Sequence, residues 1–371
     1  MPALGAAART TGASHVIPVQ EDDGWVLDNG ILRVRVDARG LITSAVDLAT
    51  GREAIAPGQA AGLLQLHRDT PTQWDAWDID VHYRDSVVDL VDAESVDADA
   101  DGLRIVRTFG SSRVTERIAL ETGSRVVSFD IDLDWHERQK LLKLAFPIDV
   151  HTDSATSEIQ FGHIERPTHT NTSWDAARFE TVAHRWVRVA EPGFGVAVVN
   201  DSTYGHDVTR ADRPDGRGTV STVRLSLIRS ALFPDPTQDE GSHRLRVGLV
   251  VGADVPAAVA EGYRINLPER VVDAAAHEVS PLLLVDADGI VVEAVKLAED
   301  GSGDVVVRLY EALGARTSGR LTPDFDAVSV IETDLLERAR EARAVTAVGD
   351  GVAHVDLDLR PFEIVTLRFA R

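Results

Sequence analysis

The feature that most constrains this sequence is an alternation of apolar and polar residues with a period of two. Between residues 127 and 135, Val, Phe, Ile, Leu and Trp alternate with one Ser and three Asp. Successive side chains of a β-strand point to opposite faces, so this segment predicts a strand with one buried and one solvated face. The same rhythm recurs at 31–36, 195–201, 224–228, 245–251, 304–311 and 354–359. Half-buried antiparallel sheets follow from this pattern.

The spacing of these strands predicts sandwiches rather than a parallel barrel. Short strands recur without amphipathic helices between them, and Gly, Asp, Asn and Pro cluster in the connections. At 371 residues, the chain exceeds the roughly 250 to 300 at which single cores stop growing. Residues 253–285 have many small residues and few strand signals, which is typical of a junction. We therefore expect a lead-in at 1–23, a large β-sandwich at 24–275 and a smaller one at 276–371.

One segment, 334–345, contains good helix formers but has a weak apolar stripe. A helix and a charged strand pair or loop remain equally open there.

The charge balance limits the partners of the chain. A formal net charge of −22 opposes a nucleic-acid or anionic-membrane partner, because binding a polyanion requires a basic surface. A neutral sugar fits better. No segment reaches the ~18 apolar residues of a membrane span, and residues 1–15 lack an apolar signal core, so we expect a cytoplasmic protein. Because the chain has no cysteine, a metal would need His, Asp or Glu ligands.

Two segments, 69–83 and 161–186, concentrate aromatic and polar residues. The first places four Asp among two Trp and a Tyr, and the second combines His, Arg, Asn, Trp and acids. Aromatic faces beside carboxylates and amides are typical of carbohydrate sites, because the ring stacks on a sugar's apolar face. The alternative is structural: Trp74, Trp77, Trp174 and Trp186 would be core anchors whose indole N–H groups bond to nearby Asp.

Four stretches resemble the signature of a known enzyme family: WDAWDID (74–80), FGHIERPTHTNTSWDAARFE (161–180), AHRW (183–186) and GFGVAVVNDSTYG (193–205). They are similar to the cytosolic or vacuolar branch of the family 38 α-mannosidases. Residues 27–53, 226–243, 306–314 and 359–368 resemble further parts of that family in the same order. The resemblance covers almost the whole chain and points to the family's carboxy-terminal β domains.

The resemblance implies a galactose-mutarotase-like β-sandwich followed by a smaller β-sandwich. It also implies a retaining enzyme that removes terminal α-linked mannose. In that family an amino-terminal barrel and helical bundle carry the zinc ligands and the nucleophilic Asp, and nothing in this sequence resembles them. We therefore expect no catalytic residue and no metal ligand in this chain. Zinc or another divalent metal would belong to an amino-terminal catalytic half, encoded separately or in the same gene.

The expected role of this chain is to brace the catalytic half and send loops toward an α-mannoside. Arg166-Pro167-Thr168 and residues 171–175 combine a fixed proline with turn-forming residues, which predicts an ordered loop. The candidates for facing the substrate or the barrel are Trp74, Asp75, Trp77, Asp78, Arg166, His169, Asn171, Asp175, His184, Arg185 and Tyr204.

Local patterns for metal binding or independent hydrolysis are weak. The pairs His151/Asp153 and His354/Asp356, and the irregular set His163, His169 and His184, do not match the three convergent ligands of catalytic zinc. A retaining glycosidase needs two carboxyl groups about 5 Å apart, and the candidates are Asp75, Asp78, Glu165, Asp175 and Glu180. Ion pairs with Arg166, Arg178 and Arg185 are the expected role for most of these acids.

Three functions remain open. The chain is the β part of an α-mannosidase, a free-standing carbohydrate-binding module, or a self-sufficient sugar enzyme such as an epimerase that uses His and a carboxylate. Oligomer formation is compatible with each.

Overall fold

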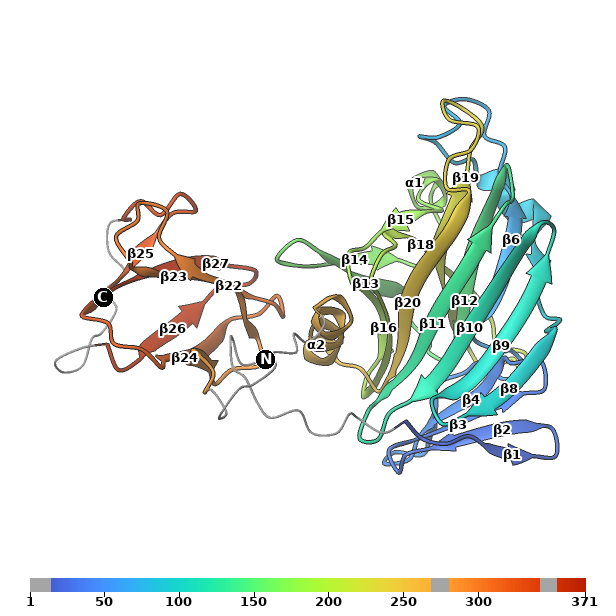
Figure 1. The fold of residues 1–371 in the computed structure, drawn as a ribbon, viewed down its shortest axis with the longest axis horizontal. Helices are drawn as coiled ribbons and strands as arrows, with labels where there is room; N and C mark the ends of the chain where they lie inside the picture. The colour runs from blue at the N-terminus through green and yellow to red at the C-terminus, as the bar shows by residue number, and fades with distance from the viewer. Residues whose placement is uncertain (1–14, 268–279, 341–351) are drawn as a thin grey trace. The chain divides into compact units, whose positions relative to one another are not determined.

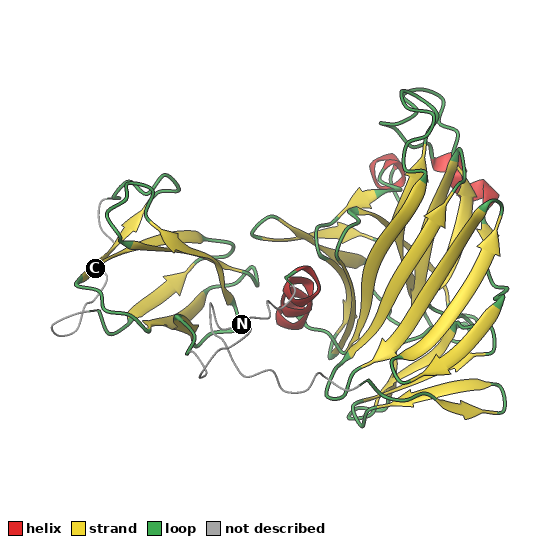
Figure 2. Cartoon of the chain, in the orientation of Figure 1, coloured by secondary structure: helices red, strands yellow, loops and turns green. Residues whose placement is uncertain are grey.

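The computed structural model describes residues 15–267, 280–340 and 352–371. The described residues divide into two compact units, a larger one of residues 15–158 and 164–267 and a smaller one of residues 159–163, 280–340 and 352–371. Strands form most of each unit (Figure 1, Figure 2). The prediction of an all-β chain with a large sandwich followed by a smaller one is confirmed. The predicted boundary near residue 275 lies outside the described residues.

Three antiparallel sheets build the larger unit. The nine-stranded sheet has the order β14-β13-β16-β17-β20-β11-β10-β9-β8, and the six-stranded sheet has the order β15-β18-β19-β12-β6-β7. The five-stranded sheet follows chain order: β1 (Val19–Glu21), β2 (Gly24–Asp28), β3 (Leu32–Asp37), β4 (Ile42–Asp47) and β5 (Arg52–Glu53).

The strands of the nine-stranded sheet are β8 (Ser95–Asp99), β9 (Gly102–Phe109), β10 (Ser112–Leu120), β11 (Val126–Trp135), β13 (Ser154–Ile159), β14 (Gly162–Pro167), β16 (Trp186–Glu191), β17 (Phe194–Asn200) and β20 (Gly241–Val251). Those of the six-stranded sheet are β6 (Leu63–Arg68), β7 (Val88–Asp89), β12 (Lys140–Ile148), β15 (Thr181–Val182), β18 (Gly205–Asp212) and β19 (Thr219–Ser230).

Strand β11 shows how the alternation builds the core. Its apolar residues are buried and its three Asp are exposed, as the period of two predicts. Phe129 of β11 meets Phe146 of β12 edge to face, with 5.5 Å between ring centroids. The nine-stranded and six-stranded sheets therefore face each other across one core. All seven predicted strand segments are strands in the structure.

The smaller unit has two antiparallel sheets. One consists of β21 (Leu283–Val285), β24 (Thr317–Pro323) and β26 (Val355–Leu359), in that order. The other has the order β22-β23-β27-β25, from β22 (Ile290–Leu297), β23 (Val305–Glu311), β25 (Ser329–Thr333) and β27 (Ile364–Ala370). Its buried side chains form a core of their own.

The described residues include one 3-10 helix, η1 (Val81–Ser86), and two α-helices, α1 (Ser173–Ala177) and α2 (Val255–Asn266). Helix α2 begins at its N-cap Asp254, which accepts from the amide of Ala257, and it packs on β16, β17 and β20. The sequence analysis did not predict it, because its four buried residues include the small Ala258 and Gly262 beside Val259 and Tyr263 and so make a weak apolar stripe.

The candidate helix at 334–345 is not a helix in its described part. Residues 334–340 form a turn and an isolated β-bridge from Ala339 to Thr333, and residues 341–345 lie outside the described residues. The reason is the one that weakened the prediction: helix propensity without an apolar face does not fix a helix on a protein surface.

An ion pair lies inside the larger unit. Arg107 of β9 contacts Glu116 of β10, and the two side chains are only 1% and 2% exposed. Arg107 also donates to the carbonyl groups of Leu90 and Arg39 at 3.0 and 2.6 Å. Burial raises the pKa of Glu116 to about 7, although the charge of Arg107 acts in the opposite direction.

This raised pKa predicts a pH dependence of stability. Between the ordinary glutamate pKa of 4.5 and the folded value of about 7, the folded chain holds more protons than the unfolded chain. The free energy of unfolding should therefore fall as the pH rises through this window. Urea unfolding of wild type and Glu116→Gln across the window should show a flatter profile in the variant. The same slope in both proteins would contradict this assignment.

Candidate functional site

Three loops meet at one end of the larger unit: residues 69–80 before η1, residues 168–180 around α1, and residues 231–240 between β19 and β20. The carboxylate of Asp75 accepts from the amides of Leu232 and Phe233 at 2.7 and 3.0 Å. Arg84 of η1 donates to the carbonyl of Phe179. Figure 1 shows α1 and the loop after β19 at the same end of the unit. We call this region the loop end.

A groove of about 650 Å³ opens at the loop end, between β12 and β19 of one sheet and β20 of the other. We call it the mouth groove. Polar side chains line it together with the indole of Trp77, and most of its apolar lining comes from strands. The lining residues are Trp77, Asp78, Ile79, Leu141, Glu180, Thr181, Val182, Ser202, Gly205, Ser226, Leu227, Ile228, Arg229, Asp239, His243, Arg244 and Leu245.

A buried lysine contacts Glu180, one of the residues that line the groove. Lys143 of β12 is fully buried, and its Nζ atom contacts the carboxylate of Glu180, Asp207 Oδ2 at 2.6 Å and the Tyr83 hydroxyl at 3.2 Å. Arg224 and Arg84 lie 2.5 and 3.4 Å from Asp207 Oδ1. We call these six residues the lysine cluster. It fixes Glu180, whose side chain is 13% exposed and lines the groove.

Burial and neighbouring charges shift the pKa values of Asp207 and Tyr83 in the lysine cluster. Burial acts to raise the pKa of Asp207, but the charges of Lys143 and Arg224 outweigh it and hold that pKa below the usual value. Burial and the two nearby carboxylates raise the pKa of Tyr83, so its phenol remains protonated. Burial lowers the pKa of His67 to about 4, which leaves this ring neutral as it packs on Tyr83, 5.1 Å between centroids.

Arg229 of β19 holds the loop that carries Trp77. Its guanidinium pairs with the buried carboxylate of Asp69 and also donates to the carbonyl groups of Ala76 and Asp78. These carbonyls flank Trp77 in the sequence. The Arg229–Asp69 ion pair, at the start of the loop, therefore helps to set the position of the exposed Trp77 indole.

The four tryptophans divide into two groups. Trp74, Trp77 and Trp174 are 68%, 68% and 75% exposed, whereas Trp186 is fully buried. The core-anchor alternative is therefore wrong for the first three, and the burial that it predicts is found for Trp186. The three exposed indoles lie in loops 69–80 and 168–180 at the loop end. They are outside the strands, so the packing of the sheets does not bury them.

The predicted residues around α1 have mainly local contacts. Asp175 accepts from the hydroxyl and amide of Thr172 in a capping box, and His169 Nδ1 lies 3.5 Å from its carboxylate. These bonds, the Thr172 hydroxyl first, lower the pKa of Asp175. Asn171 is exposed. Arg166 is half-buried with no ion pair to described residues, and burial together with Arg178 lowers its pKa.

A second, smaller groove of about 360 Å³ brings together His184, Arg185 and Tyr204. The rings of His184 and Tyr204 lie 5.6 Å apart, and Tyr204 is 65% exposed. Arg185 is committed elsewhere: its guanidinium pairs with the buried Glu158 at 2.7 Å and lies over the ring of Tyr263. This groove shares Ser202 with the mouth groove.

The carboxylates proposed from sequence have partners other than the three arginines expected. Glu180 pairs with Lys143, Asp75 with backbone amides, and Glu165 accepts from the hydroxyl of Thr156 at 2.6 Å. The prediction of ion pairs with Arg166, Arg178 and Arg185 is wrong for these acids, because the chain folds backbone amides, hydroxyls and a distant lysine against them. Sequence spacing gave no sign of these partners.

The histidine patterns do not form a metal site in the structure. Within residues 15–267, 280–340 and 352–371, no three His, Asp or Glu side chains converge as ligands. His151 Nδ1 is hydrogen-bonded to Thr219 at 2.8 Å, and His354 lies 3.8 Å from Asp356. The residues present therefore do not fit catalytic zinc. No helix of these ranges has the length and apolarity of a membrane span.

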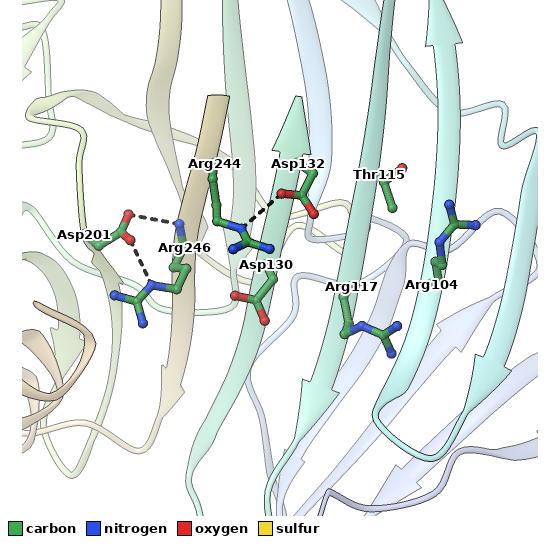
Figure 3. Close-up of a pocket in the computed structure, with 8 residues that line it drawn as sticks. All are labelled: Arg104, Thr115, Arg117, Asp130, Asp132, Asp201, Arg244 and Arg246. Carbon is green, nitrogen blue, oxygen red and sulfur yellow. Dashed lines mark hydrogen bonds and ion pairs between the residues drawn. The ribbon is translucent and has the colours of Figure 1, made fainter. Parts of the chain in front are cut away.

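The solvated face of the nine-stranded sheet carries a ladder of charges (Figure 3). A groove of about 690 Å³ there is lined by Arg104, Thr115, Arg117, Asp130, Asp132, Asp201, Arg244 and Arg246. Arg244 pairs with Asp132 at 3.1 Å and Arg246 with Asp201 at 2.9 Å. The Arg244–Asp132 pair is exposed, and such a pair contributes about 0 to 1 kcal/mol. This face is a solvated surface, as the Asp residues of β11 predicted.

Comparison with known proteins agrees with this architecture. The model of the glycosyl hydrolases family 38 C-terminal domain matches residues 27–237, and that of the family 38 C-terminal β-sandwich domain matches residues 289–367. The two sandwiches and the two matches define a β-domain portion of a glycoside hydrolase. The chain belongs to glycoside hydrolase family 38, and the resemblance seen in its motifs is confirmed.

The relatives are longer than this chain. It is 38% identical over 368 residues to human alpha-mannosidase 2C1, covering 95% of this chain and 34% of that protein. Alpha-mannosidase G of Dictyostelium discoideum is 31% identical, with 93% and 32% covered. The crystal structure of an alpha-mannosidase from Enterococcus faecalis V583 shares the fold, with a TM-score of 0.70 and 17% identity over 95% of this chain and 42% of that one. The chain thus spans about a third of its curated relatives.

Proposed function

We propose that this chain is the β-domain part of a retaining α-mannosidase, which removes terminal α-linked mannose, and that it supplies the scaffold and the carbohydrate-facing loops. Family membership supports the activity. The observation that carries the role is the loop end, where three exposed indoles lie among carboxylates, the combination that sugars favour. All the candidates named from sequence, from Trp74 to Tyr204, remain proposed contacts to substrate or catalytic part.

The chemistry of hydrolysis belongs, in this proposal, to a catalytic part outside the described residues. That part would hold zinc or another divalent metal, because the described His, Asp and Glu do not converge on one point. The loop end of this chain would be the surface that contacts the catalytic part. We also propose a cytoplasmic location, since the motif run resembles the cytosolic or vacuolar branch of the family. Fractionation of cells that express the native protein would test the location.

A chimera tests the proposed role. The region of human alpha-mannosidase 2C1 that matches this chain is replaced by the present sequence, and hydrolysis of an aryl α-mannoside is measured. We expect the chimera to be active and a variant of the human protein without this region to be inactive. A folded, zinc-loaded chimera without activity, or a deletion variant with full activity, would contradict the proposal.

A free-standing carbohydrate-binding module is the second candidate. The exposure of Trp74, Trp77 and Trp174 favours it, because an indole that protrudes from a rigid sandwich is suited to stack on sugar rings without any catalytic partner. An active chimera argues for the first candidate, whereas sugar binding together with an inactive chimera argues for the second.

A further inference from the structure

The mouth groove combines features that the proposed function does not by itself require. Its lining includes one exposed indole, that of Trp77, and a carboxylate, that of Glu180, which Lys143 holds in place. Its volume of about 650 Å³ lies within the range of small-molecule sites in proteins, roughly 300 to 1,000 Å³. The groove lies entirely within the larger unit, so its geometry depends on no other part of the chain.

We propose that the mouth groove is itself a pyranoside-binding site, in which Trp77 stacks on the apolar face of a sugar ring and Glu180 accepts a hydrogen bond from a ring hydroxyl. This inference rests on the proposed function, since it names the ligand class of the loop end. It goes further in assigning binding to this chain alone and to two specific residues.

The hydrogen-bonding capacity of Glu180 supports this assignment. Its Oε1 atom accepts from Lys143 and from the Tyr83 hydroxyl, whereas its Oε2 atom accepts only from Ser226 at 3.2 Å among the described residues. A carboxylate oxygen accepts two hydrogen bonds or more, so Oε2 retains acceptor capacity. Because the lysine cluster fixes the carboxylate, a ligand hydroxyl would meet an acceptor that is already oriented.

The remaining polar groups of the groove favour a neutral polyol over a charged ligand. Asp78 and Asp239 add carboxylates to the lining, which disfavours an anion. Two arginines also line the groove: the guanidinium of Arg229 is used by Asp69 and by two carbonyl groups, and that of Arg244 pairs with Asp132 at 3.1 Å. Leu141, Leu227 and Leu245 supply apolar surface. A sugar ring, with hydroxyl groups at its edge and C–H bonds on its faces, matches this distribution.

Titration of the purified chain with methyl α-mannopyranoside tests the inference, with binding followed by ligand-observed NMR. We expect saturable binding with a dissociation constant in the millimolar range. Trp77→Ala and Glu180→Gln should each raise that constant about tenfold or more. Phe233→Ala is the matched control, because Phe233 is an aromatic residue of the loop end that is 66% exposed but does not line the groove, and it should bind as wild type does. Glycerol lacks a ring face, so it should show no saturable binding.

The outcomes separate this inference from the proposed function. Absence of saturable binding up to about 50 mM ligand, or unchanged affinity in a folded Trp77→Ala or Glu180→Gln protein, would overturn the groove site. If Glu180→Gln does not fold, the Trp77→Ala variant alone decides the test. Trp77 is 68% exposed, so its replacement should leave the fold intact. An active chimera with no binding by the isolated chain would remove the groove site and leave the proposed function in place.

Discussion

Replacing Lys143 by Met is expected to lower the free energy of unfolding by about 3 to 5 kcal/mol. Lys143 is fully buried and neutralises two carboxylates, those of Glu180 and Asp207. Without the ammonium group, Glu180 keeps only hydroxyl partners, and Asp207 keeps two arginines. A buried charge that loses its counter-charge is strongly destabilising, whereas the methionine side chain fills most of the vacated volume. Urea unfolding followed by far-UV circular dichroism measures the difference.

Lys140→Met is the matched control for this experiment. Lys140 begins the same strand, is partly exposed, and makes no ion pair with any described residue, so its replacement should change stability by less than about 0.5 kcal/mol. Equal effects of the two substitutions would show that Lys143 does not act through its buried charge. In that case the lysine cluster would no longer explain the position of Glu180.

Trp186→Ala is expected to cost about 3 to 5 kcal/mol. Trp186 is fully buried on β16, beneath α2, where a Cβ atom on Gly262 would lie only 3.1 Å from the indole. Truncation would leave a cavity between α2 and the sheet. The cavity could close only if α2 moved. The change is measured by circular dichroism as a shift of the urea midpoint. Circular dichroism is preferred to fluorescence because the substitution removes one of the fluorescent tryptophans.

Trp174→Ala provides the comparison, because its indole is 75% exposed. Its truncation should leave the midpoint unchanged within about 0.5 kcal/mol. A large loss of stability in Trp174→Ala would mean that the loop end buries this indole in solution, and the assignment of exposed tryptophans to ligand contacts would fail with it.

The strands were predictable because their cause is local. In β11 and β26, alternate residues are apolar, and burial of one face fixes both the strand and its register. Helix α2 was not predictable on the same terms, since two of its four buried residues, Ala258 and Gly262, are small and give no apolar stripe in the sequence. Its N-cap Asp254 and the following Pro256 were the signals present in the sequence.

The contacts around the loop end were not predictable from the sequence. The motif at 74–80 singled out Trp77 and Asp78, yet nothing near them in sequence indicated that Arg229 would hold their loop through Asp69. Lys143 stands within an apolar run of β12, an unusual place for a lysine, and this was the available sign of a buried charge. Its partners come from positions 37 and 64 residues later in the chain, which only the fold brings together.

The exposure of the tryptophans shows the same limit. Composition cannot distinguish an indole in a core from one on a loop, and Trp186 and Trp174 lie in the same signature segment. The difference arises because Trp186 begins a strand that α2 covers, whereas Trp174 lies in a capped single turn of helix with no buried residue.

The central claim is that this chain supports or binds an α-mannoside while hydrolysis is carried out elsewhere. Its most direct test is the turnover of an aryl α-mannoside by the purified chain, with zinc or cobalt supplied. We predict no turnover above the rate without protein. Measurable hydrolysis that disappears in a folded Asp175→Asn or Glu180→Gln variant would contradict the claim, because it would place the catalytic carboxylates within this chain.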